Sequence, residues 1–146
     1  MVKYCVILDA NFFLVPVQFN IDIYSELDRQ IPAPFDIILP DVVIGELEAK
    51  IKHEAANHGK IKGTLSRQLN LARQIANQYN IQIIHVQRLS GQPVDTLLLL
   101  LAAEMEQKGS RVILATNDAN LRRKARAAGY ATAWLRAKKV IEVSIR

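Results

Sequence analysis

Two aspartates follow short apolar runs of the sequence. Asp9 comes after the run of residues 4–8, and Asp118 comes after the run of residues 111–115. If both runs are β-strands of one parallel sheet, their carboxyl ends share the edge at which open α/β sheets bind ligands. We therefore expect the two carboxylates to lie at one edge of the sheet.

Two further acids could join them. Asp95 begins a leucine-rich helix, and Glu46 lies one turn into the helix that follows the second apolar run. Converging carboxylates repel one another and need a counter-charge, and oxygen ligands suit a hard cation such as Mg2+ or Mn2+. One or two such ions can lower the pKa of a bound water and orient it toward a phosphodiester. That chemistry is typical of a nuclease.

Each acid also has a simpler explanation, and the sequence alone leaves both open. An aspartate at a helix start can cap the helix by accepting backbone N–H groups, which applies to Asp95 and Asp118. Asp9 and Asn11 form a D-x-N pair that an ordinary Asx-turn would also explain. Glu46 and Glu48 flank the apolar stripe of their helix on opposite sides, so the helical phase does not choose between them.

The alternation of strand and helix patterns predicts the architecture that positions these acids. β-rich apolar runs separated by helical segments favour a parallel sheet that is covered on both faces. Pro40 and Asp41 predict the start of a helix with Asp41 as its N-cap. Residues 97–101 are apolar all round, which predicts a helix buried against the sheet. The five strands are expected at residues 4–8, 36–39, 81–85, 111–115 and 131–135, with an additional edge strand at 140–145.

Length and composition indicate a single domain. The chain has 146 residues, half of them hydrophobic, and we expect one domain over residues 1–146. Its N-terminal apolar run is too short to span a membrane, so we expect a cytoplasmic protein. With Cys5 as its single cysteine, the chain can form no internal disulfide. The formal charge of +5 favours anionic partners such as nucleic acid.

Basic residues gather in two helical segments, a hairpin over residues 50–73 and the helix after Asp118. Such faces attract a phosphate backbone whatever its sequence, although a solvated helix face explains any single residue equally well. Tyr24, Tyr79 and Trp134 could stack on bases, but core packing is the favoured explanation for each. The expected nucleic-acid contacts are Lys50, Lys52, Lys60, Lys62, Arg67, Arg122 and Arg123.

Four segments of the chain together resemble the PIN-domain nucleases. In order they read VILDANFFLVP, LPDVVIGELEAK, PVDTLLLLLA and ILATNDANLRRKARAAGY, and they cover nearly the whole chain. The resemblance is nearest to the branch that processes ribosomal RNA in archaea and eukaryotes and more distant to the VapC toxins. It implies an α/β fold, a three-layer α/β/α sandwich with a central, mostly parallel five-stranded sheet. It also implies a metal-dependent endoribonuclease.

The resemblance assigns roles to individual residues. It prefers Glu46 over Glu48, and it implies that the tetrad holds one or two Mg2+ or Mn2+ ions. The third motif departs from the family, because it reads VDT where many relatives of this branch have a second adjacent acid, so the number or affinity of the metals could differ. The implied catalytic and metal-binding tetrad is Asp9, Glu46, Asp95 and Asp118, and the implied supporting residues are Asn11, Thr116 and Asn117.

Several alternatives remain open at this stage. Within the nuclease interpretation, ribosomal-RNA processing or RNA turnover competes with action as a toxin on RNA. A homodimer, an antitoxin and a ribosome-assembly protein are all compatible partners. A non-catalytic RNA-binding or assembly module is a second interpretation, against which the presence of all four acids argues. A receiver domain is a third, but the sequence lacks the adjacent acid pair expected after its first strand.

Overall fold

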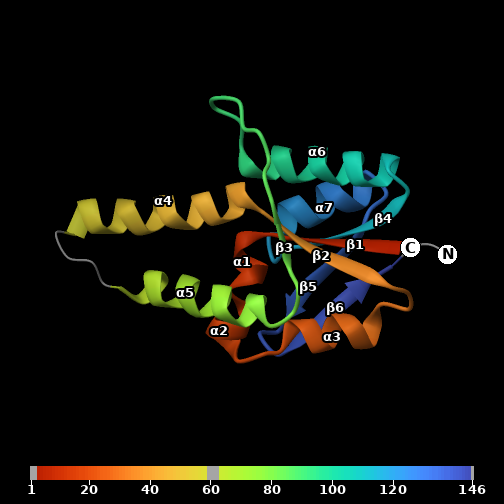
Figure 1. The fold of residues 1–146 in the computed structure, drawn as a ribbon, viewed down its shortest axis with the longest axis horizontal. Coiled ribbons are helices and arrows are strands. Elements are labelled where there is room, and N and C mark those ends of the chain that lie inside the picture. The colour runs from red at the N-terminus through yellow and green to blue at the C-terminus, as the bar shows by residue number, and fades with distance from the viewer. Residues whose placement is uncertain (1–2, 59–62, 146) are drawn as a thin grey trace.

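The computed structural model describes residues 3–58 and 63–145, which form a six-stranded sheet with helices on both faces (Figure 1). The strands lie in the order β3-β2-β1-β4-β5-β6. All neighbouring strands run parallel except β6, which is antiparallel to β5. The strands are β1 (Lys3–Leu8), β2 (Phe35–Pro40), β3 (Gln82–Ile84), β4 (Ser110–Ala115), β5 (Ala131–Arg136) and β6 (Val140–Ser144).

The two central strands carry the most apolar segments of the chain. In β1 every residue after Lys3 is buried, and the last four residues of β4 are buried as well. A strand covered on both faces needs such a continuous apolar run, because neither of its sides meets water. The two strands pair so that Leu8 lies opposite Ala115. The segments that follow them therefore leave the sheet side by side at the same edge.

Helices cover both faces of this sheet. Helices α6 and α7 pack on one face, and α2, α3 and α5 lie on the other (Figure 1). Helix α4 runs beside α5 and also contacts α6. In the part of the chain that the structure describes, no helix combines the length and apolar character needed to cross a membrane. The helices are α1 (Ala10–Phe13), α2 (Val15–Phe19), α3 (Ile23–Gln30), α4 (Asp41–His58), α5 (Thr64–Asn77), α6 (Val94–Gln107) and α7 (Ala119–Ala127).

This architecture confirms the predicted three-layer α/β/α fold with a mostly parallel sheet. Each of the five expected strands is present, with boundaries shifted by one residue at most. The additional edge strand also forms, as β6, so the sheet has six strands rather than five. It pairs antiparallel with β5 because only a tight turn separates the two strands, and a parallel partner would need a long crossover.

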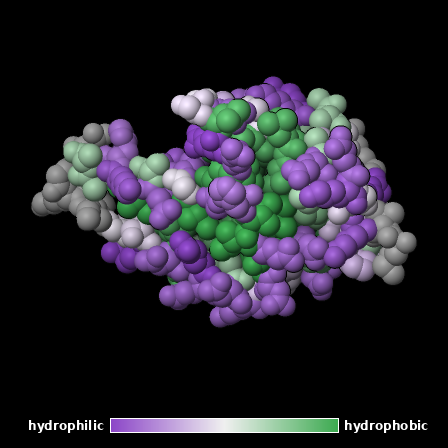
Figure 2. Space-filling model, turned by 45° about the horizontal axis from the view of Figure 1, so that its top comes forward, coloured by the Kyte–Doolittle hydropathy of each residue, from purple (hydrophilic) through white to green (hydrophobic). Residues whose placement is uncertain are grey.

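One local prediction was wrong, and another held with one exception. Helix α4 includes Asp41 rather than being capped by it, and the Asp41 carboxylate binds the chain that leaves β3. Its Oδ1 accepts the Val86 N–H at 2.9 Å, and its Oδ2 lies 2.7 Å from Nδ1 of His85. Helix α6 packs against the sheet as predicted, with Leu97, Leu98 and Leu101 buried, although 56% of Leu100 is exposed. Leu100 borders a hollow of about 660 Å³ between α6 and the segment after β3, and Figure 2 shows hydrophobic residues gathered in a hollow on this face.

Candidate active site

Asp9 is the buried centre of the acidic site. It follows β1 directly and has only 6% of its surface exposed. Its Oδ1 accepts the N–H of Ala10 at 2.8 Å and so caps the short helix α1. Its Oδ2 accepts the hydroxyl of Thr116 at 2.7 Å. Because each carboxylate oxygen has two lone pairs, each keeps one that these bonds do not use.

Thr116 links Asp9 to Asp118. It is fully buried behind the end of β4. While its hydroxyl donates to Asp9, the same oxygen accepts the backbone N–H of Asp118 at 3.1 Å. A hydroxyl has one proton to donate and two lone pairs, so both bonds form together. One side chain thus fixes both the orientation of Asp9 and the backbone of Asp118.

Two asparagines hold the loop between β4 and α7. Oδ1 of Asn11 accepts the backbone N–H of Asn117 at 2.9 Å, which ties the chain after β1 to the chain after β4. Oδ1 of Asn117 accepts the N–H of Leu135 at 2.8 Å, which ties the same loop to β5. The loop is therefore anchored on both of its sides. The D-x-N spacing noted in the sequence is used here for a contact across the sheet rather than for a local turn.

Asp118 and Asp95 differ in how their carboxylates are used. Asp118 is the N-cap of α7, and its Oδ1 accepts the N–H groups of Asn120 and Leu121 at 2.8 and 3.2 Å. Asp95 lies inside the first turn of α6, after an N-cap at Pro93 that makes no side-chain bond. Both aspartates are half-buried. The capping explanation therefore holds for Asp118 and fails for Asp95.

Glu46 faces the aspartates, and Glu48 does not. Glu46 is half-buried on α4, whereas Glu48, half a turn further on, is exposed. Burial raises the pKa of Glu46, and the nearby charges of Asp9 and Asp95 raise it further. The side chain of Glu46 therefore lies within electrostatic range of both aspartates. The helical phase alone could not choose between Glu46 and Glu48.

Repulsion by neighbouring acids contributes to the raised pKa of Asp9. Burial raises the pKa of Asp9 above 3.8, and Asp95 and Asp118 raise it further, while the hydrogen bonds from Thr116 and Ala10 oppose the shift. Across residues 3–58 and 63–145, no three His, Cys, Asp or Glu side chains lie close enough together to form a ready metal cage. The four acids are thus neighbours at one edge of the sheet, but their carboxylates do not meet at a single point.

A small basic hollow adjoins Glu46. It has a volume of about 430 Å³ and is lined by Gly45, Glu46, Ala49, Lys50, His53, Arg88 and Val94. The charges of Lys50 and Arg88 both oppose the rise in the pKa of Glu46. The Nε of Arg88 donates to the backbone oxygen of Gln92 at 3.0 Å, which holds the guanidinium on the loop before α6. Arg88 was not among the predicted site residues, because nothing in its local sequence pattern links it to α4.

The other predicted nucleic-acid contacts fall in different places. Lys50, Lys52 and Arg67 are exposed on the hairpin of α4 and α5. Arg123 is exposed and Arg122 half-buried on α7, the helix that Asp118 caps. Lys60 and Lys62 lie outside the described residues.

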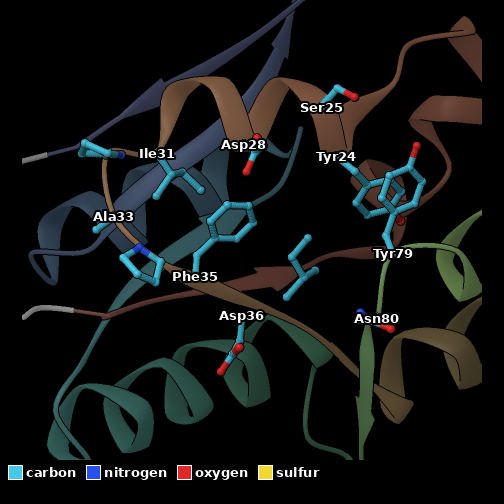
Figure 3. Close-up of a pocket in the computed structure, with 12 residues that line it drawn as sticks. Tyr24, Ser25, Asp28, Ile31, Ala33, Phe35, Asp36, Tyr79 and Asn80 are labelled. Atoms are coloured by element: carbon cyan, nitrogen blue, oxygen red, sulfur yellow. The ribbon is translucent and has the colours of Figure 1, made fainter.

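A larger hollow lies away from the acids. It measures about 850 Å³ and lies between α3 and the amino-terminal half of β2. Figure 3 shows the stacked rings of Tyr24 and Tyr79 at one end of it and Asp36 at another. The two ring centroids are 4.5 Å apart. Asp9 follows the carboxyl end of the neighbouring parallel strand β1, whereas this hollow borders the amino-terminal half of β2. The hollow is therefore not part of the acidic site. Its two tyrosines stack against each other.

Position in the sheet explains why the acids are neighbours. The chain proceeds from β1 to β2 on one side and places β4 on the other side of β1, so the order of the strands reverses between β1 and β4. Open α/β sheets bind ligands at this kind of switch point. Asp9 and Asp118 follow the two strands that border it.

The comparisons with known proteins agree with this geometry. A solved structure described as the PIN domain endonuclease Utp24 is 25% identical, with a TM-score of 0.68, and the match covers 96% of this chain and 90% of that one. A domain of a functionally unknown protein from Methanocaldococcus jannaschii DSM 2661 is 21% identical, with a TM-score of 0.57 and 98% of each chain covered. No protein with a curated description matches. The family model of the PIN like domain matches residues 6–138. The chain therefore belongs to the PIN-like domain family.

Proposed function

We propose that this chain is a metal-dependent endoribonuclease that hydrolyses RNA phosphodiesters at Asp9, Glu46, Asp95 and Asp118. The observation that carries the proposal is the buried carboxylate of Asp9, held by Thr116 with three other acids around it at the switch point of the sheet. Family membership and the similarity to a PIN domain endonuclease support a nuclease.

The donor set fits a hard divalent cation. All four side chains offer oxygen ligands only, which suits Mg2+ or Mn2+. The raised pKa values of Asp9 and Glu46 reflect burial and like-charge repulsion. A bound cation would offset the cost of burying the two charges and reduce their repulsion. Asp9, Asp95 and Asp118 would hold the metal, and Glu46 would act on it directly or through a water. When bound, the metal supplies an activated water and charge stabilisation for the leaving oxygen.

The chain's own residues have separate tasks in this scheme. Thr116 holds the carboxylate of Asp9 in one orientation through its hydrogen bond, so the carboxylate is already oriented before the metal binds. The asparagines at positions 11 and 117 hold the loop that carries Asp118 against both neighbouring strands. Glu46 lies half-buried beside Asp9 and Asp95 and would bind the metal directly or orient a water on it.

Basic side chains flank the acids on two sides and define a path for RNA. Lys50 and Arg88 line the hollow beside Glu46. On the other side, Arg122 and Arg123 follow Asp118 on α7. A polyanion that crosses the acidic site would be attracted at both ends, which offsets its repulsion by the carboxylates. The run ATNDANLRRKARAAG resembles the ribosomal-RNA-processing branch. It favours a role in RNA processing, with structured or ribosomal RNA as the substrate, over a role as a toxin.

Cleavage assays test the proposal. A structured ribosomal RNA fragment and a generic single-stranded RNA are incubated with Mg2+, Mn2+ or EDTA. We expect metal-dependent cutting by the native chain and none by Asp9→Asn, whose amide keeps the shape and can still cap α1 but cannot serve as an anionic ligand. Asp22→Asn is the matched control, because Asp22 also caps a helix and lies at the start of α3. If no metal supports cutting of either RNA, or if Asp9→Asn cuts normally, the proposal fails.

A further inference from the structure

Two arginines of α7 lie over a single indole ring. The Cζ atoms of Arg122 and Arg126 are 4.9 and 5.1 Å from the ring centroid of Trp134. Trp134 is half-buried on β5, beneath α7. The negative face of an indole attracts a guanidinium, so the ring restrains two long side chains that would otherwise move freely in water. The pair is therefore held in place on the surface of α7.

The arginine pair continues the line that begins at Asp118. The N–H of Arg122 donates to the backbone oxygen of Asp118, which places the two residues one helical turn apart on the same face. Arg126 follows one turn later. Arg122 is thus one turn nearer than Arg126 to the acidic end of α7. It is the cation of the pair nearer to the proposed site of cleavage.

These charges are not neutralised within the described part of the protein. Arg29 and Arg136 form ion pairs with Glu26 and Glu142. For Arg122 and Arg126, by contrast, residues 3–58 and 63–145 provide no carboxylate within ion-pair distance. Two like charges one turn apart repel each other, which the indole offsets only in part. Such an arrangement lacks an anion, and a phosphate group would supply it.

Arg122 and Arg126 are held differently. The Nε of Arg126 lies 3.4 Å from the hydroxyl of Thr132, a long contact that directs this guanidinium back toward the sheet. Over the described residues, Arg122 makes no side-chain hydrogen bond of its own. Its five N–H donors remain available in a fixed planar fork, which matches two oxygens of a phosphate. Arg122 is therefore the phosphate-contacting member, and Arg126 the supporting one.

We propose that Arg122 binds an RNA phosphate beside the acidic site, and that Trp134 is a positioning residue that holds its guanidinium in place. The proposal rests on the proposed function for the identity of the polyanion. Core packing was the favoured prediction for Trp134, whereas two arginines lie over its half-buried ring. Trp134 thereby affects RNA binding without touching the reacting atoms.

RNA binding in EDTA tests the proposal separately from cleavage. Fluorescence anisotropy of a short labelled single-stranded RNA gives Kd at several salt concentrations for the full chain. We expect Arg122→Gln to weaken binding about tenfold and to reduce the slope of log Kd against log salt by about 0.7, the value for one lost phosphate contact. Arg126→Gln should have a smaller effect. The control Arg29→Gln removes the same charge on α3, and both its affinity and its slope should match the native chain.

Trp134 variants test the positioning role. Trp134→Leu should weaken binding about threefold without changing the salt slope, because both charges remain, and Trp134→Phe should restore much of the loss. Where cleavage is measurable, Trp134→Leu should raise KM and leave kcat unchanged. The phosphate contact is refuted if Arg122→Gln and Arg29→Gln give the same slope. The positioning role is refuted if Trp134→Phe, folded as judged by its unfolding transition, binds as poorly as Trp134→Leu. If the native chain cuts no RNA but the slopes differ as expected, the endonuclease proposal fails while the phosphate contact stands.

Discussion

Replacing Thr116 by valine should damage the acidic site without changing its shape. Valine has nearly the volume of threonine but lacks the hydroxyl. In the native chain this hydroxyl donates to Oδ2 of Asp9 at 2.7 Å and accepts the N–H of Asp118 at 3.1 Å. Thr116 is fully buried, so no water can enter its position to replace both bonds. The variant would leave a buried carboxylate oxygen and a half-buried N–H without these partners.

The size of the effect follows from these two bonds. A hydrogen bond to an ionised carboxylate contributes about 2 kcal/mol, and an N–H that loses its acceptor costs about 1 kcal/mol. Together they predict a loss of about 3 kcal/mol in the free energy of unfolding, or about 10 °C in Tm for a chain of this size. Thr116→Ser keeps the hydroxyl and loses one buried methyl group, which should cost only about 1 kcal/mol.

The pH dependence identifies the bond that is lost. The Thr116 hydroxyl lowers the pKa of Asp9 against the stronger effect of burial, so this pKa should be higher in Thr116→Val. The variant's deficit should therefore be complete at a pH high enough to ionise Asp9 in both proteins. It should shrink as the pH falls through the pKa of Asp9 and its carboxyl becomes neutral. Urea unfolding at neutral and acidic pH measures this. A serine variant as unstable as the valine variant, or a deficit that does not change with pH, would refute the reasoning.

Three further predictions concern single groups. Burial and neighbouring acids raise the pKa of Asp9, so the native fold loses stability as pH rises through that pKa. At neutral pH the Asp9→Asn variant should therefore unfold at a higher temperature than the native chain. This advantage should vanish below pH 3.8, where the carboxyl is protonated in both the folded and the unfolded native chain. Glu46→Gln should reduce kcat about a hundredfold, while Glu48→Gln, exposed on the same helix, should leave it unchanged in the cleavage assay. Burial raises the pKa of Cys5 to about 11, so this thiol should react with Ellman's reagent only after unfolding, and rapid reaction of the native chain would contradict its buried position.

The central features of the fold could be predicted because they depend on local sequence. Runs such as CVIL in β1 are both β-rich and continuously apolar, a combination that indicates a central strand. The order of the strands then brought Asp9 and Asp118 to neighbouring carboxyl ends, as expected. The choice between Glu46 and Glu48 needed the three-dimensional structure, because the direction of a helix face depends on how the helix packs and not on its own periodicity.

Contacts between distant segments could not be predicted. Arg88 meets the surroundings of Glu46 only because the loop before α6 folds back toward α4. Asp41 carries the signature of an N-cap, but the chain after β3 passes close enough to take its carboxylate instead. Capping and such a tertiary hydrogen bond require the same residue type at the same position. The local pattern cannot distinguish them.

Asp9 explains why the acidic site is built from polar residues that the core would otherwise exclude. An ionised carboxylate with 6% of its surface exposed is unfavourable, and two hydrogen bonds reduce this cost. Among the residues that the structure describes, no lysine or arginine forms an ion pair with it. A lysine or arginine in contact with Asp9 would stabilise the fold further, but it would occupy the space and satisfy the charge that a metal ion needs. The hydroxyl of Thr116 orients the carboxylate and leaves its charge uncompensated. The unfavourable burial of its ionised carboxylate is thus the property that makes Asp9 a strong candidate ligand.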